Sequence, residues 1–266
     1  MKTVTNLLTI FILIIVFCFC SEDNDQNDFK SSTFAIYDGK GWSDGVTAFV
    51  EFLKWKKISY QKISPSYINN TKLLDNFKAI YFPGGDADDY VAELTKGGID
   101  NIRNFVNSGG GYIGICAGAE FASDVLIWNG VSIEYPLKLF HGQAIGPYDE
   151  IARYPVYDMT MVTLNSENII NKNEPAERSV LYFGGTSFHP YDNSSINIIA
   201  TYNELNNLPA AINFNYGNGK VVLIGPHPEI DEESDRDNSS EISGLTDGAD
   251  GSDWPWLSSV IDWILN

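Results

Sequence analysis

The chain has 266 residues, of which 44% are hydrophobic, and it carries a formal net charge of −18. A chain of this length and composition can bury the core of one large globular domain. The acidity opposes nucleic-acid binding, which requires a basic surface, so we expect no nucleic-acid partner.

The first 32 residues differ from the rest of the chain. Lys2 precedes an apolar run from Leu7 to Cys20, and a polar segment follows. The run is shorter than the ~20 apolar residues of a membrane span and is typical of a signal peptide. We predict a signal peptide or lipoprotein signal at residues 1–20, with its final cysteine lipidated in the second case, and a polar tether at residues 21–32. Because Phe17–Phe19 lacks the small residues usual before a lipidated cysteine, a simple cleaved signal and an uncleaved anchor remain alternatives. The expected location is extracytoplasmic, with membrane attachment only through this segment.

From Thr33 onward, strand-like and helix-like segments alternate. Short apolar runs predict strands, and apolar residues at helical spacing predict helices. Because the two alternate, we expect a parallel sheet covered on both faces, with ligands bound beyond the carboxyl ends of its strands. The predicted strands are Thr33–Tyr37, Ile58–Ile63, Lys78–Phe82 and Tyr112–Ile115, and the predicted helices are Val46–Lys57 and Ile99–Val106.

The second half of the chain is less regular and predicts shorter strands. These are Leu137–Gly146, Met159–Leu164, Ser179–Phe183, Ile196–Tyr202, Ala210–Phe214 and Val221–Ile224. Tyr216–Lys220 predicts a hairpin turn between the last two strands. Trp254–Leu265 predicts a closing helix with Pro255 in its first turn. Between them, the acidic residues 230–253 predict a solvated loop, a candidate lid, rather than a calcium site.

A cysteine follows the strand at residues 112–115. Cys116 lies between Gly114 and Gly118, the spacing of a sharp strand-to-helix turn that presents a nucleophile. A helix that begins just after Cys116 directs N–H groups at the sulfur and favours the thiolate. The alternative interpretation is a buried core cysteine. No other cysteine occurs after residue 20, so we predict no disulfide within the domain.

A thiol that attacks a carbonyl group needs a base, a group that orients the base, and N–H donors for the oxyanion. His227 follows a strand, and Glu229, two residues later, can hold one imidazole nitrogen while the other faces the sulfur. His141 and His189 also follow apolar strands, but neither has a carboxylate at this spacing. We therefore prefer His227 as the base.

The turn after the strand at residues 78–82 supplies further candidates. The backbone N–H groups of Gly85 and Ala117 are the predicted oxyanion donors. Gly84 and Asp86 are candidate substrate-binding residues. We expect neither a metal site nor a cofactor.

Two of these motifs resemble a known superfamily. Gly114–Gly118 and His227–Glu229 resemble the cysteine elbow and the His-x-Glu pair of class I glutamine amidotransferases. More narrowly, five segments resemble the biotin-protein ligase N-terminal-type domain: Tyr81–Asp86, Gly109–Ala119, Gly142–Pro147, Tyr182–Gly185 and Gly219–Glu229.

The resemblance implies a flavodoxin-like three-layer α/β fold for residues 33–266, with a mostly parallel central sheet and additional antiparallel strands in the second half. It also implies Cys116, His227 and Glu229 as a catalytic triad. One hypothesis is a cysteine-dependent amide hydrolase or amidotransferase-like protein acting on a small-molecule amide or peptide-like ligand. The other is a noncatalytic small-ligand-binding module that retains the pocket, since folds and sites are reused without turnover. The sequence leaves the substrate and the oligomeric state open.

Overall fold

The computed structural model describes residues 33–266 except 71, 73–75, 232–234, 240–241 and 243–250. The predicted signal and tether at residues 1–32 therefore lie outside the described residues. So does much of the acidic segment 230–253. Within the described ranges, no helix is long and apolar enough to cross a membrane.

Every strand and helix expected from the sequence overlaps an observed element. The strands are β1 (Phe34–Tyr37), β2 (Tyr60–Ile63), β3 (Ala79–Phe82), β4 (Gly111–Ile115), β5 (Ser123–Trp128), β6 (Val131–Glu134), β7 (Phe140–Gly146), β8 (Asp158–Leu164), β9 (Glu177–Tyr182), β10 (Ser187–Pro190), β11 (Asn197–Tyr202), β12 (Leu208–Tyr216) and β13 (Gly219–Ile224). The helices are α1 (Ser43–Trp55), α2 (Pro65–Asn70), α3 (Ala87–Glu93), α4 (Lys96–Asn107), α5 (Ala117–Ala122) and α6 (Trp254–Leu265).

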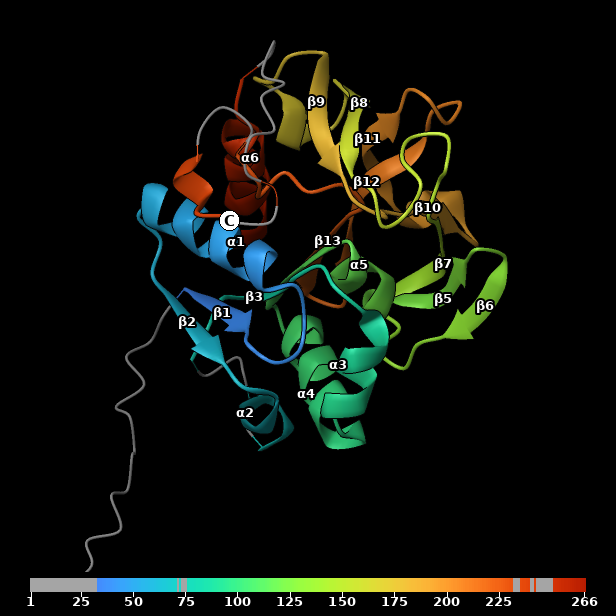
Figure 1. Cartoon of the computed structure of the whole chain (residues 1–266). Coiled ribbons are helices and arrows are strands. Elements are labelled where there is room, and N and C mark those ends of the chain that lie inside the picture. The colour runs from blue at the N-terminus through green and yellow to red at the C-terminus, as the bar shows by residue number, and fades with distance from the viewer. Residues whose placement is uncertain (1–32, 71, 73–75, 232–234, 240–241, 243–250) are drawn as a thin grey trace, which may run out of the picture.

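A nine-stranded sheet runs through the molecule in the order β2-β1-β3-β4-β13-β12-β11-β8-β9 (Figure 1). The strands from β2 to β13 pair in parallel, and those from β13 to β9 pair antiparallel. The predicted α/β fold with antiparallel strands from the second half is therefore confirmed. Because β3, β4 and β13 are parallel neighbours, their carboxyl ends meet at one edge of the sheet.

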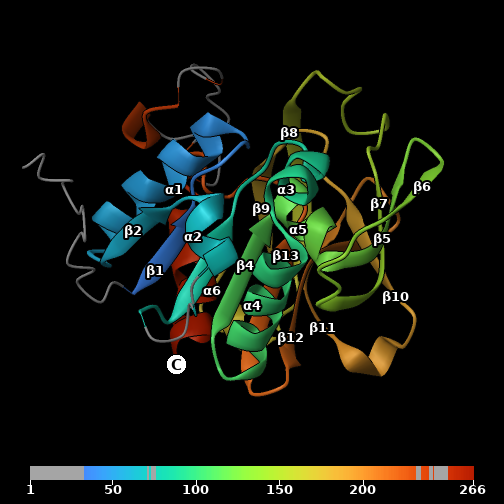
Figure 2. The ribbon, with the colours of Figure 1, turned by 90° about the horizontal axis from the view of Figure 1, so that it is seen from below.

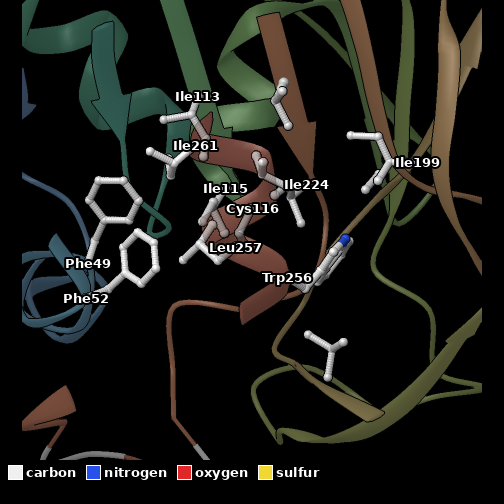
Figure 3. Close-up of a cluster of buried hydrophobic side chains, with 14 of the residues drawn as sticks. Phe49, Phe52, Ile113, Ile115, Cys116, Ile199, Ile224, Trp256, Leu257 and Ile261 are labelled. Carbon is white, nitrogen blue, oxygen red and sulfur yellow. The ribbon is translucent and has the colours of Figure 1, made fainter. Parts of the chain in front are cut away.

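Helices cover both faces of the parallel half. Successive strand residues point to opposite faces, so Phe34 and Ile36 pack with α1 and α6, whereas Ala35 and Tyr37 pack with α2, α3, α4 and α5. Figure 2 shows α3 and α4 in front of the sheet and α6 behind it. The core on the α1 and α6 side includes Cys116 (Figure 3).

A second sheet, in the order β10-β7-β5-β6, lies beside the first. It packs on the antiparallel half of the main sheet through Phe140, whose ring centroid is 5.9 Å from that of Phe214 on β12. Strand β5 begins directly after α5. The second sheet therefore brings the end of β5, at Trp128, toward the edge where Cys116 lies.

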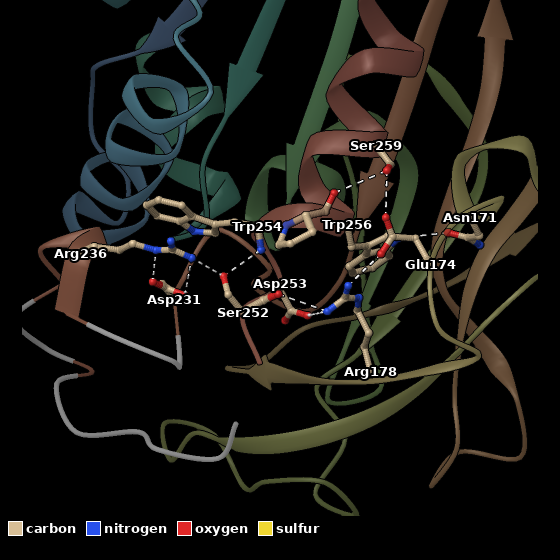
Figure 4. Close-up of polar contacts among 11 residues, drawn as sticks. Asn171, Glu174, Arg178, Asp231, Arg236, Ser252, Asp253, Trp254, Trp256 and Ser259 are labelled. Atoms are coloured by element: carbon tan, nitrogen blue, oxygen red, sulfur yellow. Dashed lines mark hydrogen bonds and ion pairs between the residues drawn. The ribbon is translucent and has the colours of Figure 1, made fainter. Parts of the chain in front are cut away.

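The described parts of the acidic segment 230–253 are not a solvated loop, contrary to the prediction. Asp231, Asp237 and Asp253 are buried. Arg236 forms an ion pair with Asp231 and lies 4.2 Å from the ring centroid of Trp254 (Figure 4). The like-charge argument does not hold for these residues, because Arg236 lies within the segment and supplies a counter-charge to Asp231.

Candidate functional site

Cys116 occupies the turn between β4 and α5. Its backbone has φ 50° and ψ −115°, a positive-φ conformation that is rare for a residue with a side chain and is typical of functional turns. A Cβ atom on Gly114 would overlap the carbonyl oxygen of Gly118, and one on Gly118 would overlap that of Phe82. The two glycines are therefore needed for the close contact between this turn and the neighbouring strand.

The pairing of β13 with β4 brings His227 to the same edge. Ile224 is in register with Ile115, and the N–H of Cys116 donates to the carbonyl oxygen of Ile224 at 2.8 Å. His227 follows Ile224 by three residues. Imidazole Nδ1 of His227 lies 2.9 Å from Oε1 of Glu229, and both side chains are at most 1% exposed. The predicted orienting contact is thus present in the structure.

The other imidazole nitrogen, Nε2, is on the side of Cys116. A Cβ atom on Gly84 would lie 2.8 Å from Cε1 of His227 and 3.5 Å from Cβ of Cys116, so the two side chains are neighbours. Among the described residues, no atom lies in a position to form a hydrogen bond with Nε2. The sulfur instead lies 3.8 Å from the carbonyl oxygen of Phe183.

The electrostatic environment favours a protonated His227. Burial lowers its pKa, but the charges of Glu229 and of a Cys116 thiolate outweigh burial and raise the pKa to about 10. An imidazolium beside the sulfur stabilises a thiolate, as a neighbouring positive charge does in reactive cysteines.

A cavity of about 330 Å³ opens beside Cys116. Of the predicted site residues, Cys116, His227, Gly85 and Asp86 line it. Glu229, Gly84 and Ala117 are buried and do not belong to the lining. The remaining lining residues are Gly41, Trp42, Asp89, Glu120, Trp128, Tyr154 and Phe183.

The two predicted oxyanion donors differ in position. Among the described residues, nothing accepts a hydrogen bond from the N–H of Gly85 or of Ala117. Gly85 lines the cavity, whereas Ala117 is fully buried at the start of α5. Gly85 has φ 129°, and a Cβ atom there would lie 2.8 Å from the backbone nitrogen of Trp42. An alanine at position 85 would therefore displace the loop as well as alter the donor.

Sequence reasoning missed the aromatic wall and one acid of this cavity. Trp128 and Tyr154 come from segments that carried no predicted element, and Phe183 directly follows β9. Glu120 had a usable signal, because it lies four residues after Cys116, one turn along the predicted helix. Its side chain is 4% exposed, and its Oε1 has no partner among the described residues.

Burial raises the pKa of Glu120 to about 8; Asp86 and Asp88 add to this rise, and His227 opposes it. Much of this carboxyl group is therefore neutral at pH 7 when the cavity is empty. A buried carboxyl group without a partner is costly, and such groups occur at functional sites more often than elsewhere.

The other two histidines lie on the small sheet. Nδ1 of His141 is 2.6 Å from Oδ2 of Asp124, and Nε2 of His189 is 2.8 Å from Oγ of Ser187. Neither histidine lines the cavity beside Cys116. The geometry therefore favours His227 over His141 and His189 as the candidate base for Cys116.

A larger and more open hollow, of about 740 Å³, lies beside β11 and β12. Its lining includes several asparagines but none of the predicted site residues. In the part of the chain that the structure describes, no group of three or more His, Cys, Asp or Glu side chains could hold a metal ion.

Comparison with known proteins places this arrangement in a family. Residues 33–249 match the family described as biotin-protein ligase, N terminal. The chain belongs to this family. It is 29% identical over 167 residues to a biotin-protein ligase of Schizosaccharomyces pombe, covering 58% of this chain and 26% of the relative. It is 33% identical over 162 residues to an uncharacterized protein of Chlamydia muridarum, covering 56% of this chain and 60% of the relative. The matches thus span less than two thirds of the length of either relative.

Solved structures show the same fold. A glutamine amidotransferase superposes with a TM-score of 0.54 at 18% identity, over 74% of this chain and 90% of its own. PurLQS from Thermotoga maritima superposes with a TM-score of 0.55 at 15% identity, over 88% of this chain and 99% of its own. This biotin-protein ligase N-terminal domain therefore has a glutamine amidotransferase-like fold.

Proposed function

We propose that this protein is a cysteine-dependent amide hydrolase with Cys116 as nucleophile, His227 as proton carrier and Glu229 as the group that orients the imidazole. The observation that carries the proposal is the contact of Nδ1 of His227 with Glu229 beside a strained cysteine that lines a cavity. A nucleophile, a base and an orienting group in contact are the arrangement that nucleophilic catalysis requires.

In the proposed reaction, the sulfur of Cys116 attacks the amide carbon. A C–S bond forms, and the carbonyl electron pair moves to the oxygen, where the N–H groups of Gly85 and Ala117 stabilise the charge. His227 gives its proton to the leaving nitrogen as the C–N bond breaks, which releases ammonia or an amine and leaves a thioester. Water then attacks the thioester, His227 takes a proton from that water, and the C–S bond breaks to release the acid.

A specific contact favours the alternative, a noncatalytic module that binds a small ligand in the same cavity. The sulfur of Cys116 lies 3.8 Å from the carbonyl oxygen of Phe183, within reach for a thiol to donate to it. Only a protonated thiol can donate to this oxygen, and a thiol is a weaker nucleophile than a thiolate. Cysteine reactivity therefore discriminates between the two functions, because only the thiolate is a strong nucleophile.

Iodoacetamide should alkylate Cys116 at pH 7 much faster than it alkylates free cysteine. A free thiol has a pKa of about 8.5, so its rate rises roughly tenfold per pH unit below that value. In the proposed enzyme a protonated His227 beside the sulfur favours the thiolate, so the rate at Cys116 should depend on pH less steeply than that of free cysteine. The alkylation rate is measured by mass spectrometry of the labelled peptide. His227→Ala should slow it, whereas His141→Ala should not. A rate that follows free cysteine at every pH would support the binding module instead.

The location remains a separate proposal, because the predicted signal at residues 1–20 lies outside the described residues. We expect the mature protein outside the cytoplasm, attached to the membrane through its N-terminus. Cell fractionation followed by mass spectrometry of the N-terminal peptide measures this. Recovery of cytosolic protein with Met1 intact would contradict it.

A further inference from the structure

The cavity beside Cys116 carries an excess of negative charge. An adjoining hollow of about 230 Å³ shares the walls Gly85, Asp86, Glu120, Trp128 and Tyr154 with it. Asp88 lines the second hollow and Asp89 the first, and no described residue that lines either one is a lysine or arginine.

Within the described part of the chain, Asp89 is the only one of these acids that forms an ion pair with a lysine or arginine. Nζ of Lys40 lies 3.5 Å from Asp89 at the exposed rim. Asp86 accepts the N–H of Asp88 at 2.9 Å, and Asp88 accepts the hydroxyl of Tyr135 at 3.1 Å, but these neutral donors leave both charges in place.

The charge of His227 does not offset this excess. A protonated His227 is paired with the buried carboxylate of Glu229, whose Oε1 lies 2.9 Å from its Nδ1. Glu120, buried in the wall that the two hollows share and unpartnered at Oε1, is the acid that an incoming positive charge would satisfy.

The aromatic side chains that line the cavity also favour a positively charged ligand. The ring centroids of Trp42 and Phe183 are 5.7 Å apart, those of Phe183 and Tyr154 are 5.7 Å apart, and those of Tyr154 and Trp128 are 5.5 Å apart. The four rings form a continuous row along the cavity. Aromatic faces next to carboxylates attract ammonium groups, including quaternary ones, through the negative potential of the rings.

We propose that this cavity selects amides that carry a positively charged ammonium group close to the carbonyl carbon, with Glu120 and the aromatic row as the cation-binding element. The N–H of Glu120 donates to the carbonyl oxygen of Cys116 at 3.0 Å, and both residues line the same cavity. The cation therefore lies a few bonds from the carbon that the sulfur attacks. The position of the amide rests on the proposed function, whereas the binding of the cation does not.

Two amides of the same shape, only one of which is positively charged, test whether the charge of the ligand determines binding. Glycine betaine amide carries a trimethylammonium group, and 3,3-dimethylbutanamide replaces its nitrogen with carbon. We expect the wild-type protein to bind the cationic amide about tenfold or more tightly than the neutral one, as measured by calorimetry at pH 7. Glu120→Gln keeps the shape of the side chain and should reduce the ratio to about threefold or less.

A matched control tests whether the effect is local. Glu177→Gln makes the same chemical replacement at an exposed residue of β9 that lines neither hollow, and it should leave the ratio unchanged. If Glu120→Gln fails to fold, Asp86→Asn provides the second variant, because asparagine keeps the cap of α3 while removing the charge.

The two proposals can fail separately. Equal binding of the two amides overturns the cation site, and so does a ratio that survives Glu120→Gln or, where that variant does not fold, Asp86→Asn. A charge-dependent ratio without ammonia release from either amide upholds the cation site and contradicts hydrolysis. Ammonia release at equal efficiency from both amides supports hydrolysis and contradicts the cation site.

Discussion

Replacing Cys116 or His227 with alanine should lower kcat for amide hydrolysis about a thousandfold or more. The double variant should have a kcat no lower than that of the less active single variant. The reason is that nucleophile and proton carrier act in one step, so the loss of either removes the same pathway. Neither side chain has a substitute, because His141 and His189 lie on the small sheet and do not line the cavity. Ammonia release from a panel of amides, including glutamine and small peptides, measures the effect.

Glu229→Gln should cost less than either of these changes. Glutamine keeps the size of a side chain that is fully buried, but it loses the charge that stabilises the imidazolium. The His227 pKa, raised in part by Glu229, should therefore fall, and with it the positive charge beside the sulfur. His141→Ala serves as the control that leaves turnover unchanged. If Cys116→Ala hydrolyses amides as well as the wild type, or no amide is hydrolysed while ligands still bind, the enzyme interpretation is wrong.

Arg178→Met should destabilise the fold by about 3–5 kcal/mol, since the removal of one partner from a buried ion pair leaves the other charge uncompensated. The guanidinium of Arg178 lies 2.8 Å from Glu174 and 3.5 Å from Asp253, and all three side chains are at most 7% exposed. Arg178 also donates to the carbonyl oxygen of Ser252 at 3.2 Å (Figure 4). These contacts join β9 to the start of α6, which covers the sheet behind Cys116.

Urea unfolding followed by tryptophan fluorescence measures this loss of stability. Lys96→Met removes an exposed ion pair with Asp100 and should leave the midpoint within error, because exposed pairs contribute little. The double variant Arg178→Met with Glu174→Gln should recover part of the loss, since it removes a charge that the single variant leaves unpaired. A midpoint for Arg178→Met equal to that of the wild type would show that the cluster contributes nothing to stability.

Local patterns in the sequence determined the elements and the motifs on them. The apolar runs of β1, β3, β4 and β13 were recognisable because strands buried on both faces are apolar along their whole length. Strand β6 and helix α3 were missed because β6 is mostly exposed and α3 buries only Ala87 and Tyr90, too few residues to establish a period.

The same distinction applies to the site. Gly114, Cys116 and Gly118 were found from their spacing, and His227 and Glu229 from theirs, because each set lies within a few residues of chain. Contact between the two sets depends on the parallel pairing of β13 with β4, which places residues more than a hundred positions apart at one sheet edge.

Only the tertiary structure decided what surrounds Cys116. Trp42, Trp128, Tyr154 and Phe183 come from four separate segments and meet only when the small sheet packs beside the large one. Burial is also a property of the assembled layers, because a side chain loses its water only when other elements cover it. The sequence therefore predicted a reactive cysteine with its histidine and glutamate, and the packing of distant segments produced the acidic, aromatic cavity that Glu120 lines.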